Sequence, residues 1–484
     1  MLTLAEAQQL LSQAGLASTL VGDPATPINR VHTDTRTLQP GDLFVALRGE
    51  RFDGHDHLSA ARQAGAAAAL AEQGIEAAGL PGLQVDDALA ALQQLAAGWR
   101  ARLRLPLIAV VGSNGKTTVT QMVGSILNAY NPGRVLVTAG NLNNHIGVPL
   151  TLLRLRPEHQ AAVLELGMNH PGEIALLARL VAPTVVLVNN AQREHLEFMH
   201  SVEAVASENG AAITALPADG VAVLPVTDAQ APLWREMAGS RETLWFGSSC
   251  TDDPDRLVAS EAAVFGWGQW QADALQWNLS LRSPVGSETI TLSLPGRHNL
   301  HNAVAAAAAS VALGVPIDAV QRGLQAFRAV AGRSQTSTLG MQGRMLTLVD
   351  DSYNANPDSV LAAIDLLADM DTPRWLLLGD MGEVGSDGPR FHAEAGAAAR
   401  EAGIEHLWAV GAASEQVGAD RHFGTLADCL SALQSDADLP DCASVLVKGS
   451  RFMQMEQVVG ALKARASTSA QTPAQTPQGA AHAA

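Results

Sequence analysis

One glycine-rich segment carries residue types suited to holding a polyphosphate. Residues 112–118, with the sequence GSNGKTT, stand between an apolar β-branched run and a stretch whose apolar residues recur at helical spacing. Glycines let backbone N–H groups approach phosphate oxygens, and the start of a helix adds its positive dipole. Lys116 would neutralise the outer phosphates, and Thr117 would ligate Mg²⁺. The segment therefore predicts a nucleoside-triphosphate site formed by Gly112, Ser113, Asn114, Gly115, Lys116, Thr117 and Thr118.

This segment is shorter than the full Walker pattern. Val110 stands where the longer pattern has its first glycine, so the match is to a G-x-x-G-K-T-T form. The alternative is a glycine turn with a surface lysine. The order of strand, loop and helix favours the nucleotide site over that alternative.

Other polar side chains follow expected strands of the same region, at the strand ends where open α/β sheets bind ligands. Glu165 near the end of a strand over 161–166 is expected to hold Mg²⁺ or its water, the alternative being a buried structural glutamate. His195 follows a strand over 184–188 and would be a metal ligand or a phosphate contact, or else a surface or capping residue. Three amides would either donate to phosphate or only turn the chain, namely Asn141, Asn143 and Asn144.

A second polar cluster lies in the last third of the chain. Arg333 follows a glycine, and the expected strand over 345–349 is followed at once by Asp350, Asp351, Ser352, Tyr353, Asn354 and Asn356. Such a cluster at a domain junction would clamp a nucleotide ribose or phosphates, or it would be an Asx-rich turn. Two further pairs follow strands, Asp380 with Glu383 and Lys448 with Arg451, and the basic pair would hold a carboxylate or form a solvated edge.

Composition limits the function classes. The formal net charge of −17 argues against a nucleic-acid surface, which needs basic clusters. Cys250, Cys429 and Cys442 are far apart in sequence, so we expect buried free thiols rather than a disulfide framework or a zinc site. No uninterrupted apolar stretch of about 18 residues occurs, so we expect a soluble, cytoplasmic protein without membrane insertion.

Elements that alternate between strand and helix predict an α/β protein of two to four domains over 484 residues. A short amphipathic helix over residues 1 to about 25 opens a small α/β unit that ends near residue 100. A parallel sheet follows over 101–327, with an antiparallel insertion over 240–295, and a doubly wound sheet follows over 328–465. The low-complexity tail 466–484 is expected to be disordered. Other expected strands cover 43–47, 107–111, 134–138, 375–378, 407–410 and 444–447, and other expected helices cover 57–65, 202–216, 359–370, 390–403 and the alanine tract after Arg297.

Six motifs, in order, resemble the Mur ligase family: GSNGKTT, GNLNNHIGVPLT, ELGMNHPGEI, PGRHNLHNAVAA, GRSQ and DDSYNANPDS. The last of these and LGDMGEVG resemble the branch that joins D-alanyl-D-alanine to UDP-N-acetylmuramoyl-tripeptide. The resemblance implies a UDP-sugar-binding domain over 1–100, a central ATP-binding domain over 101–327 and a Rossmann-like domain over 328–465. It also implies ATP and Mg²⁺ as cofactors, an acyl-phosphate intermediate and release of ADP.

The resemblance also implies residue roles. Lys116, Glu165 and His195 would be catalytic, with Thr117, Glu165 and His195 as metal ligands. Asn299, Arg333 and Asp351 would bind the nucleotide. Thr35 and Arg36 in DTRT would contact the uridine diphosphate, and Asp53, Gly54 and His55 match the family's D-G-H turn. Taken with the amide loops above, the substrate-binding set is Thr35, Arg36, Asn143, Asn144, Asn354 and Asn356.

One position departs from the family pattern. Most relatives have a carbamate-modified lysine on the helix after the histidine motif, and here Asn209 aligns with it. An amide cannot form a carbamate, so a negative charge near the second Mg²⁺ must come from elsewhere. We hypothesise that Glu208, Glu194 or Glu197 supplies it.

Two other functions are considered. Another Mur-family amide ligase that adds a single amino acid is the nearer alternative, and the lack of a D-N-P-R string argues against it. A nucleotide-driven switch protein is the second, and the DTRT and D-G-H turns argue against it. We expect a monomer.

Overall fold

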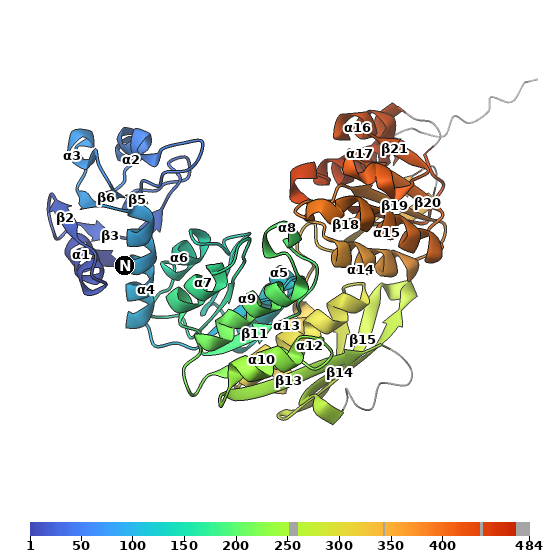
Figure 1. Ribbon diagram of the computed structural model, residues 1–484, viewed down its shortest axis with the longest axis horizontal. Coiled ribbons are helices and arrows are strands. Elements are labelled where there is room, and N and C mark those ends of the chain that lie inside the picture. The colour runs from blue at the N-terminus through green and yellow to red at the C-terminus, as the bar shows by residue number, and fades with distance from the viewer. Residues whose placement is uncertain (251–259, 342–343, 436–438, 471–484) are drawn as a thin grey trace, which may run out of the picture.

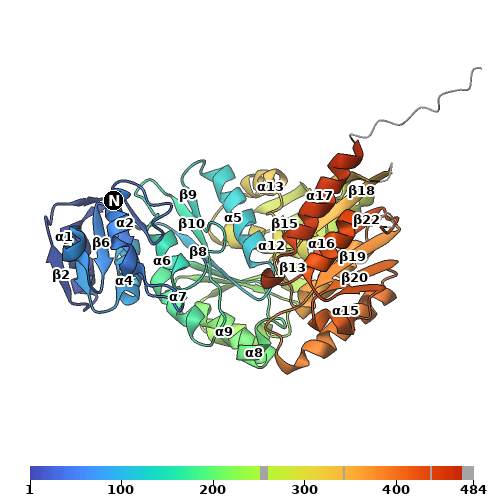
Figure 2. The same ribbon diagram turned by 90° about the horizontal axis from the view of Figure 1, so that it is seen from above.

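Three large sheets with their helices lie in a row along the molecule (Figure 1). The computed structural model describes residues 1–250, 260–341, 344–435 and 439–470. Figure 2 shows the same order from above, with the N-terminal, central and C-terminal units following one another. The α/β fold class predicted from the sequence is confirmed.

The N-terminal unit has a five-stranded sheet that is parallel except for one edge strand. Its order is β2 (Ser18–Val21), β7 (Gly82–Val85), β6 (Ala68–Ala71), β5 (Asp42–Val45) and β4 (Arg30–His32), with β2 antiparallel. Strands β1 (Leu2–Thr3) and β3 (Pro27–Ile28) form a separate pair. The helices are α1 (Leu4–Gln13), α2 (Leu58–Gln63) after the 3-10 turn η1 (Gly54–His57), and α3 (Ile75–Ala78). The helix expected within 1–25 is therefore shorter, because β2 already begins at Ser18.

Helix α4 (Ala88–Arg102) joins the N-terminal unit to the central unit. It packs against α6 (Gly147–Leu152) and α7 (Glu173–Val181) of the central unit, and its apolar face belongs to a hydrophobic core that continues from one unit into the other. Trp99 Nε1 donates to Leu155 O at 3.0 Å, and buried Arg100 Nε donates to Val181 O at 3.0 Å. These contacts fix the orientation of the N-terminal unit.

The central unit has a nine-stranded sheet with helices on both faces. Its order is β16 (Gly286–Leu292), β15 (Gln276–Ser283), β14 (Val264–Gln271), β13 (Glu242–Ser249), β12 (Val221–Pro225), β11 (Val185–Val188), β8 (Leu107–Val111), β10 (Ala161–Glu165) and β9 (Val135–Val137). One face carries α5 (Lys116–Tyr130), α12 (Arg297–Ala312) and α13 (Ile317–Ala326). The other face carries α6 (Gly147–Leu152), α7 (Glu173–Val181), α9 (Val202–Thr214) and α10 (Ala231–Ala238), and α8 (Leu196–Met199) lies beside α9.

The prediction of an antiparallel insertion over 240–295 is only partly confirmed. Strands β13 and β14 pair in parallel with the sheet, and only β14, β15 and β16 pair antiparallel. The segment extends the same sheet and does not interrupt it. Residues 251–259 of this segment lie outside the described residues.

The alanine tract forms the buried helix α12, as predicted. Every residue from Ala303 to Ala309 is fully buried against the sheet. Small side chains let the helix approach the strands closely, and α12 packs against β11, β12, β13 and β14.

The C-terminal unit has a six-stranded sheet that is parallel except at one edge. Its order is β17 (Gln335–Met341), β18 (Arg344–Asp351), β22 (Ser444–Lys448), β19 (Arg374–Gly379), β20 (His406–Val410) and β21 (Arg421–Phe423). The helices are α14 (Pro357–Ala368), α15 (Gly388–Glu401), α16 (Leu426–Ser435) and α17 (Glu456–Ala470). Strand β17, antiparallel to β18, was not expected from the sequence.

Helix α17 runs to Ala470, so it includes the first residues of the segment expected to be a tail. Residues 471–484 of that tail lie outside the described residues. In the described part of the chain the three cysteines are free thiols; Cys429 and Cys442 are buried, as predicted, whereas Cys250 is only partly buried. None of the described helices has the length and apolar character of a membrane span.

Candidate active site

A cavity of about 780 Å³ lies between the central and C-terminal units. Strands β8, β10 and β11 run parallel, so their carboxyl ends open on the same edge and bring their following loops together. The C-terminal unit closes the other side with the loop after β18 and the start of α14. Lining residues from the two sides include Lys116, Thr117, Glu165, His195, Asn299, Arg333, Asp351, Asn354 and Asn356. The structure thus brings together residues as far apart in sequence as Ser113 and Lys448.

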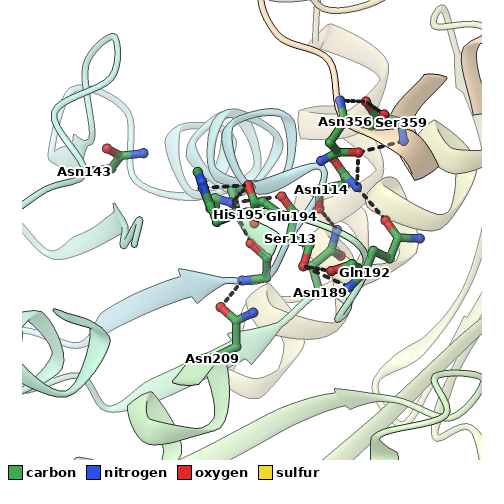
Figure 3. Close-up of polar contacts among 12 residues, drawn as sticks. Ser113, Asn114, Asn143, Asn189, Gln192, Glu194, His195, Asn209, Asn356 and Ser359 are labelled. Atoms are coloured by element: carbon green, nitrogen blue, oxygen red, sulfur yellow. Dashed lines mark hydrogen bonds and ion pairs between the residues drawn. The ribbon is translucent and has the colours of Figure 1, made fainter. Parts of the chain in front are cut away.

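Side-chain amides contact the glycine-rich loop over residues 112–118, which we call the phosphate loop. Gly112 N donates to Asn209 Oδ1 at 3.0 Å, a contact visible in Figure 3. Gly115 has a φ of 81°, and a Cβ there would lie 2.4 Å from Asn302 Oδ1. Glycine is therefore required at Gly115 for both its backbone angle and its space.

Lys116 points back over its own loop. Its Nζ donates to Gly112 O at 2.6 Å, to Ser113 O at 2.9 Å and to Glu194 Oε1 at 2.9 Å. Lys116 is therefore not the exposed lysine of the alternative interpretation; it is a partly buried cation at the N-terminus of helix α5. An ammonium in this position can neutralise phosphate charge.

Glu165 is buried, with one carboxylate oxygen paired and one not. Asn143 Nδ2 donates to Glu165 Oε1 at 2.7 Å, and Glu165 N donates to Thr138 Oγ1 at 2.9 Å. Oε2 is buried and has no hydrogen-bond partner among the described residues. A buried carboxylate oxygen without a donor is costly unless a cation meets it. The donor set of Glu165 and nearby Thr117 therefore fits Mg²⁺, which prefers oxygen ligands.

His195 takes a left-handed backbone conformation, with a φ of 51°, at the start of α8. Its Nε2 lies 3.5 Å from Glu194 Oε1, and its Nδ1 lies 2.5 Å from Glu383 Oε2 of the C-terminal unit. The imidazole of His195 beside it holds the pKa of Glu383 below its usual value. His195 therefore bridges two carboxylates from the two units.

On the C-terminal side, Asp351 accepts hydrogen bonds from Ser334 N at 2.9 Å and from Lys448 Nζ at 2.6 Å. Burial alone would raise the pKa of Asp351, but the Lys448 ammonium and the hydrogen bonds lower it. Lys448 itself is buried, so it is not part of a solvated edge. Burial lowers the pKa of His298, beside Ser334, to about 4, so this imidazole is neutral near pH 7.

Several predicted residues have local structural contacts. Asn144 Oδ1 accepts from Gly147 N, at the start of α6, at 2.8 Å, and Asn299 Nδ2 donates to Pro295 O at 2.8 Å. Arg333 lies over the Tyr353 ring at 4.3 Å, at the wall of the cavity. Arg451 is exposed and pairs with Glu456 on the surface, 3.0 Å away.

Two carboxylates that were singled out in the C-terminal unit support turns. Asp380 Oδ1 accepts from Ser414 N at 2.7 Å, and Asp350 Oδ1 accepts from Ser352 Oγ at 2.6 Å. The first contact holds the loop after β20, and the second is an Asx turn after β18. For Asp350, the turn alternative is therefore the one that the geometry supports.

The motif residues of the N-terminal unit do not line the cavity. Arg36 is exposed and pairs with Asp34 at 2.7 Å. His55 Nε2 accepts from Glu72 N at 3.0 Å, and Asp53 caps the η1 turn. The D-G-H turn therefore stabilises the fold of its own unit.

Some lining residues were not singled out from the sequence. They are amides and a histidine that meet only in the folded chain: Asn189, Asn190, Gln192, His298 and Asn302. Asn189 Nδ2 donates to Asn114 O at 2.8 Å and to Asn302 Oδ1 at 3.0 Å. The position of Asn189 and Asn190 directly after an expected strand was the available signal.

Three family models match the chain. The Mur ligase middle domain matches residues 110–310, the model described as Mur ligase family, catalytic domain matches residues 27–100, and the model described as Mur ligase, glutamate ligase domain matches residues 332–451. Together these models cover most of the described chain.

Curated relatives and solved structures agree with these matches. UDP-N-acetylmuramoyl-tripeptide–D-alanyl-D-alanine ligase of Escherichia coli is 40% identical, over 90% of this chain and 94% of that protein. The enzyme with the same name from Bacillus subtilis is 33% identical, over 90% of this chain and 93% of that protein. A crystal structure of MurF from Acinetobacter baumannii superposes with a TM-score of 0.83 at 33% identity, over 95% of this chain and 98% of that chain.

Proposed function

The chain belongs to the Mur ligase family, and on this premise we propose that it joins D-alanyl-D-alanine to UDP-N-acetylmuramoyl-tripeptide while ATP is converted to ADP and phosphate. The observation that carries the proposal is the position of Lys116, partly buried at the start of α5 in a cavity that is also lined by Glu165, which has one unpaired oxygen. A cation and a carboxylate at this edge suit phosphoryl transfer.

The reaction has two steps. A carboxylate oxygen of the tripeptide attacks the γ-phosphorus of ATP, and the bond between this phosphorus and the oxygen of the β-phosphate breaks. ADP is released, and the tripeptide now carries an acyl phosphate. The amine of D-alanyl-D-alanine then attacks the carbonyl carbon, loses a proton, and displaces inorganic phosphate. Positioning and charge neutralisation supply most of the catalysis in such transfers.

The proposed residue roles combine the geometry of the cavity with the family resemblance. Lys116 neutralises charge on the transferring phosphoryl group, and Thr117, Glu165 and His195 are the proposed Mg²⁺ ligands. The Mg²⁺ would neutralise phosphate oxygens as a Lewis acid. Arg333, Asp351 and Asn299 contact the nucleotide, and the substrate contacts are Thr35, Arg36, Asn143, Asn144, Asn354 and Asn356.

This chemistry belongs to peptidoglycan synthesis and so to cell-wall formation, cell shape and division. ATP and a UDP-linked sugar peptide are substrates found in the cytoplasm, and we propose that compartment. Monomeric state stays a prediction.

A coupled assay of ADP release tests the proposal. The full chain is supplied with Mg·ATP and UDP-N-acetylmuramoyl-tripeptide, with D-alanyl-D-alanine, with single amino acids in its place, or with no amine. We expect turnover only with the dipeptide. Turnover with a single amino acid would favour the nearer alternative, and full ATP turnover without either acceptor would contradict a ligase.

A further inference from the structure

We propose that Glu194 exchanges one cation for another during the reaction cycle: it holds Lys116 in the free protein and takes a divalent cation when bound nucleotide draws Lys116 onto phosphate. This inference rests on the proposed function, because it needs a nucleotide in the cavity. It selects Glu194 from the three glutamates that the sequence offered as a source of negative charge near a second Mg²⁺, and it adds the exchange with Lys116.

The first observation is the burial and pairing of Glu194. Its side chain is buried and lines the cavity. Both carboxylate oxygens accept from Lys116 Nζ, at 2.9 and 3.2 Å, and the nearest other basic atom is His195 Nε2 at 3.5 Å. Removing the cation from a buried ion pair leaves an uncompensated charge, which is strongly unfavourable.

The second observation is how Lys116 uses its donors. An ammonium has three N–H donors, and those of Lys116 are directed at Gly112 O, Ser113 O and the Glu194 carboxylate. A phosphate can therefore gain Lys116 only by taking it from these acceptors. A phosphate next to Glu194 would also repel that carboxylate. A divalent cation placed between the phosphate and the Glu194 carboxylate would neutralise charge on both.

The other glutamates considered from the sequence do not reach the cavity. Glu208 Oε1 and Oε2 accept from the backbone N–H groups of Ile174 and Gly172, at 2.7 and 2.9 Å, and so cap α7. Glu197 is exposed. Asn209 lies beneath the phosphate loop, where it contacts Gly112 N and does not line the cavity (Figure 3). Only Glu194 among them can meet a bound ion.

A second, independent feature of the same cavity points to a cation. Glu165 is 2% exposed, and its Oε2 has no hydrogen-bond partner in the described chain. Within the described residues no three His, Cys, Asp or Glu side chains group closely enough to ligate one ion. Mg²⁺ commonly takes one or two carboxylates and completes its shell with phosphates and water, so a nucleotide must be present for the exchange.

Manganese titration of the full chain tests this proposal. Free Mn²⁺ is followed by electron paramagnetic resonance with β,γ-methylene-ATP present and acceptors absent, for the wild type, Glu194→Gln and Glu197→Gln. We expect Mn²⁺ to bind Glu194→Gln with the analogue at least about tenfold more weakly, a loss that even outer-shell partners of metal ligands cause. Glu197→Gln, a neighbouring glutamate that is exposed, should match the wild type.

A metal-free measurement distinguishes cation exchange from a role that only positions Lys116. In EDTA, Glu194→Gln should bind the ATP analogue as tightly as the wild type or more tightly, because Lys116 no longer has that carboxylate as a partner. Mn²⁺ binding by Glu194→Gln equal to the wild type would overturn the proposal. If circular dichroism shows that Glu194→Gln is unfolded, the same titration is made with Glu194→Asp. We expect this variant to bind Mn²⁺ more weakly than the wild type, and binding equal to the wild type would contradict the proposal. Because no acceptor is present, failure here leaves the ligase assay unaffected.

Discussion

The side-chain amides of Asn114 and Asn356 hydrogen-bond to each other in both directions across the boundary between the phosphate loop and the C-terminal unit. Asn356 Nδ2 donates to Asn114 Oδ1 at 2.9 Å, and Asn114 Nδ2 donates to Asn356 Oδ1 at 3.3 Å. Asn356 Oδ1 also accepts from Ser359 N and so caps α14. A loop suited to hold phosphates is thereby joined to the first turn of a helix in the other unit (Figure 3).

Replacing Asn356 by aspartate separates these two roles. Asn356→Asp keeps an oxygen that can cap α14 but has no N–H for Asn114 Oδ1. We expect the KM for ATP to rise about 2- to 10-fold, the equivalent of one neutral hydrogen bond, with little change in the thermal unfolding midpoint. Steady-state ADP release and thermal melts measure the two effects. An unchanged KM would show that the amide pair does not influence nucleotide binding.

Arg193 makes a second connection between the units. Its Nη2 lies 2.7 Å from Asp358 Oδ1 and its Nη1 lies 2.9 Å from Glu394 Oε2, and all three side chains are partly buried. Arg193→Ala should weaken the docking of the C-terminal unit by about 1–3 kcal/mol, between the values for exposed and buried ion pairs. Hydrogen exchange at the first turn of α14 should become faster. Arg451→Ala, which removes an exposed pair with Glu456, is the matched control and should leave that exchange unchanged.

Lys116 is the most direct test of the catalytic assignment. Lys116→Ala removes the ammonium at the start of α5, and we expect ADP formation at saturating Mg·ATP to fall at least about 100-fold, as for loss of one charge-stabilising donor. Lys116→Arg should not restore the rate, because a planar, larger guanidinium cannot replace the compact point charge that an ammonium brings to phosphate. Wild-type peptide joining by Lys116→Ala would contradict the assignment.

Local patterns predicted the elements that carry the site. The strand 107–111, the glycine loop and the helix that begins at Lys116 are adjacent in sequence, and the strand ends that present Glu165 and His195 followed from apolar runs. The direction of strands β13 and β14 was harder to predict. Short runs of alternating polar and apolar residues suggested antiparallel strands, but both strands pair in parallel on the side of β12.

The contacts that tune the site are long-range. Asn143 meets Glu165 from 22 positions away, and Glu194 meets Lys116 from 78 positions away. Neither pairing leaves a periodic signal in the sequence. The sequence could therefore name Glu194 only as one of three candidates, and the fold separates it from Glu197 and Glu208.

The contact between Asn143 and Glu165 predicts a positioning effect on metal use. Asn143→Ala removes the donor that holds Glu165 Oε1, so the Mg²⁺ concentration for half-maximal ADP release should rise roughly 10- to 100-fold. Glu165→Gln should have a larger effect. In the double variant the Asn143 change should add little, because both act through one carboxylate. Fully additive effects would show that Asn143 acts elsewhere, for example on substrate.

His298 predicts how stability depends on pH. Burial lowers its pKa to about 4, with Lys448 and His301 acting in the same direction and Asp351 opposing them. An unfolded histidine has a pKa of about 6.5. Between these values the unfolded chain binds a proton that the folded chain does not, so stability rises with pH across this window and is lost as pH falls from about 6.5 towards 4.

Urea unfolding at pH 7 and pH 5 measures this effect. The wild type should lose more free energy of unfolding between these pH values than His298→Gln, whose side chain does not titrate. His200→Gln is the matched control, because His200 is exposed, and it should keep the wild-type dependence on pH. A loss as large in His298→Gln as in the wild type would mean that other groups, and not the buried imidazole beside Ser334, cause the acid sensitivity.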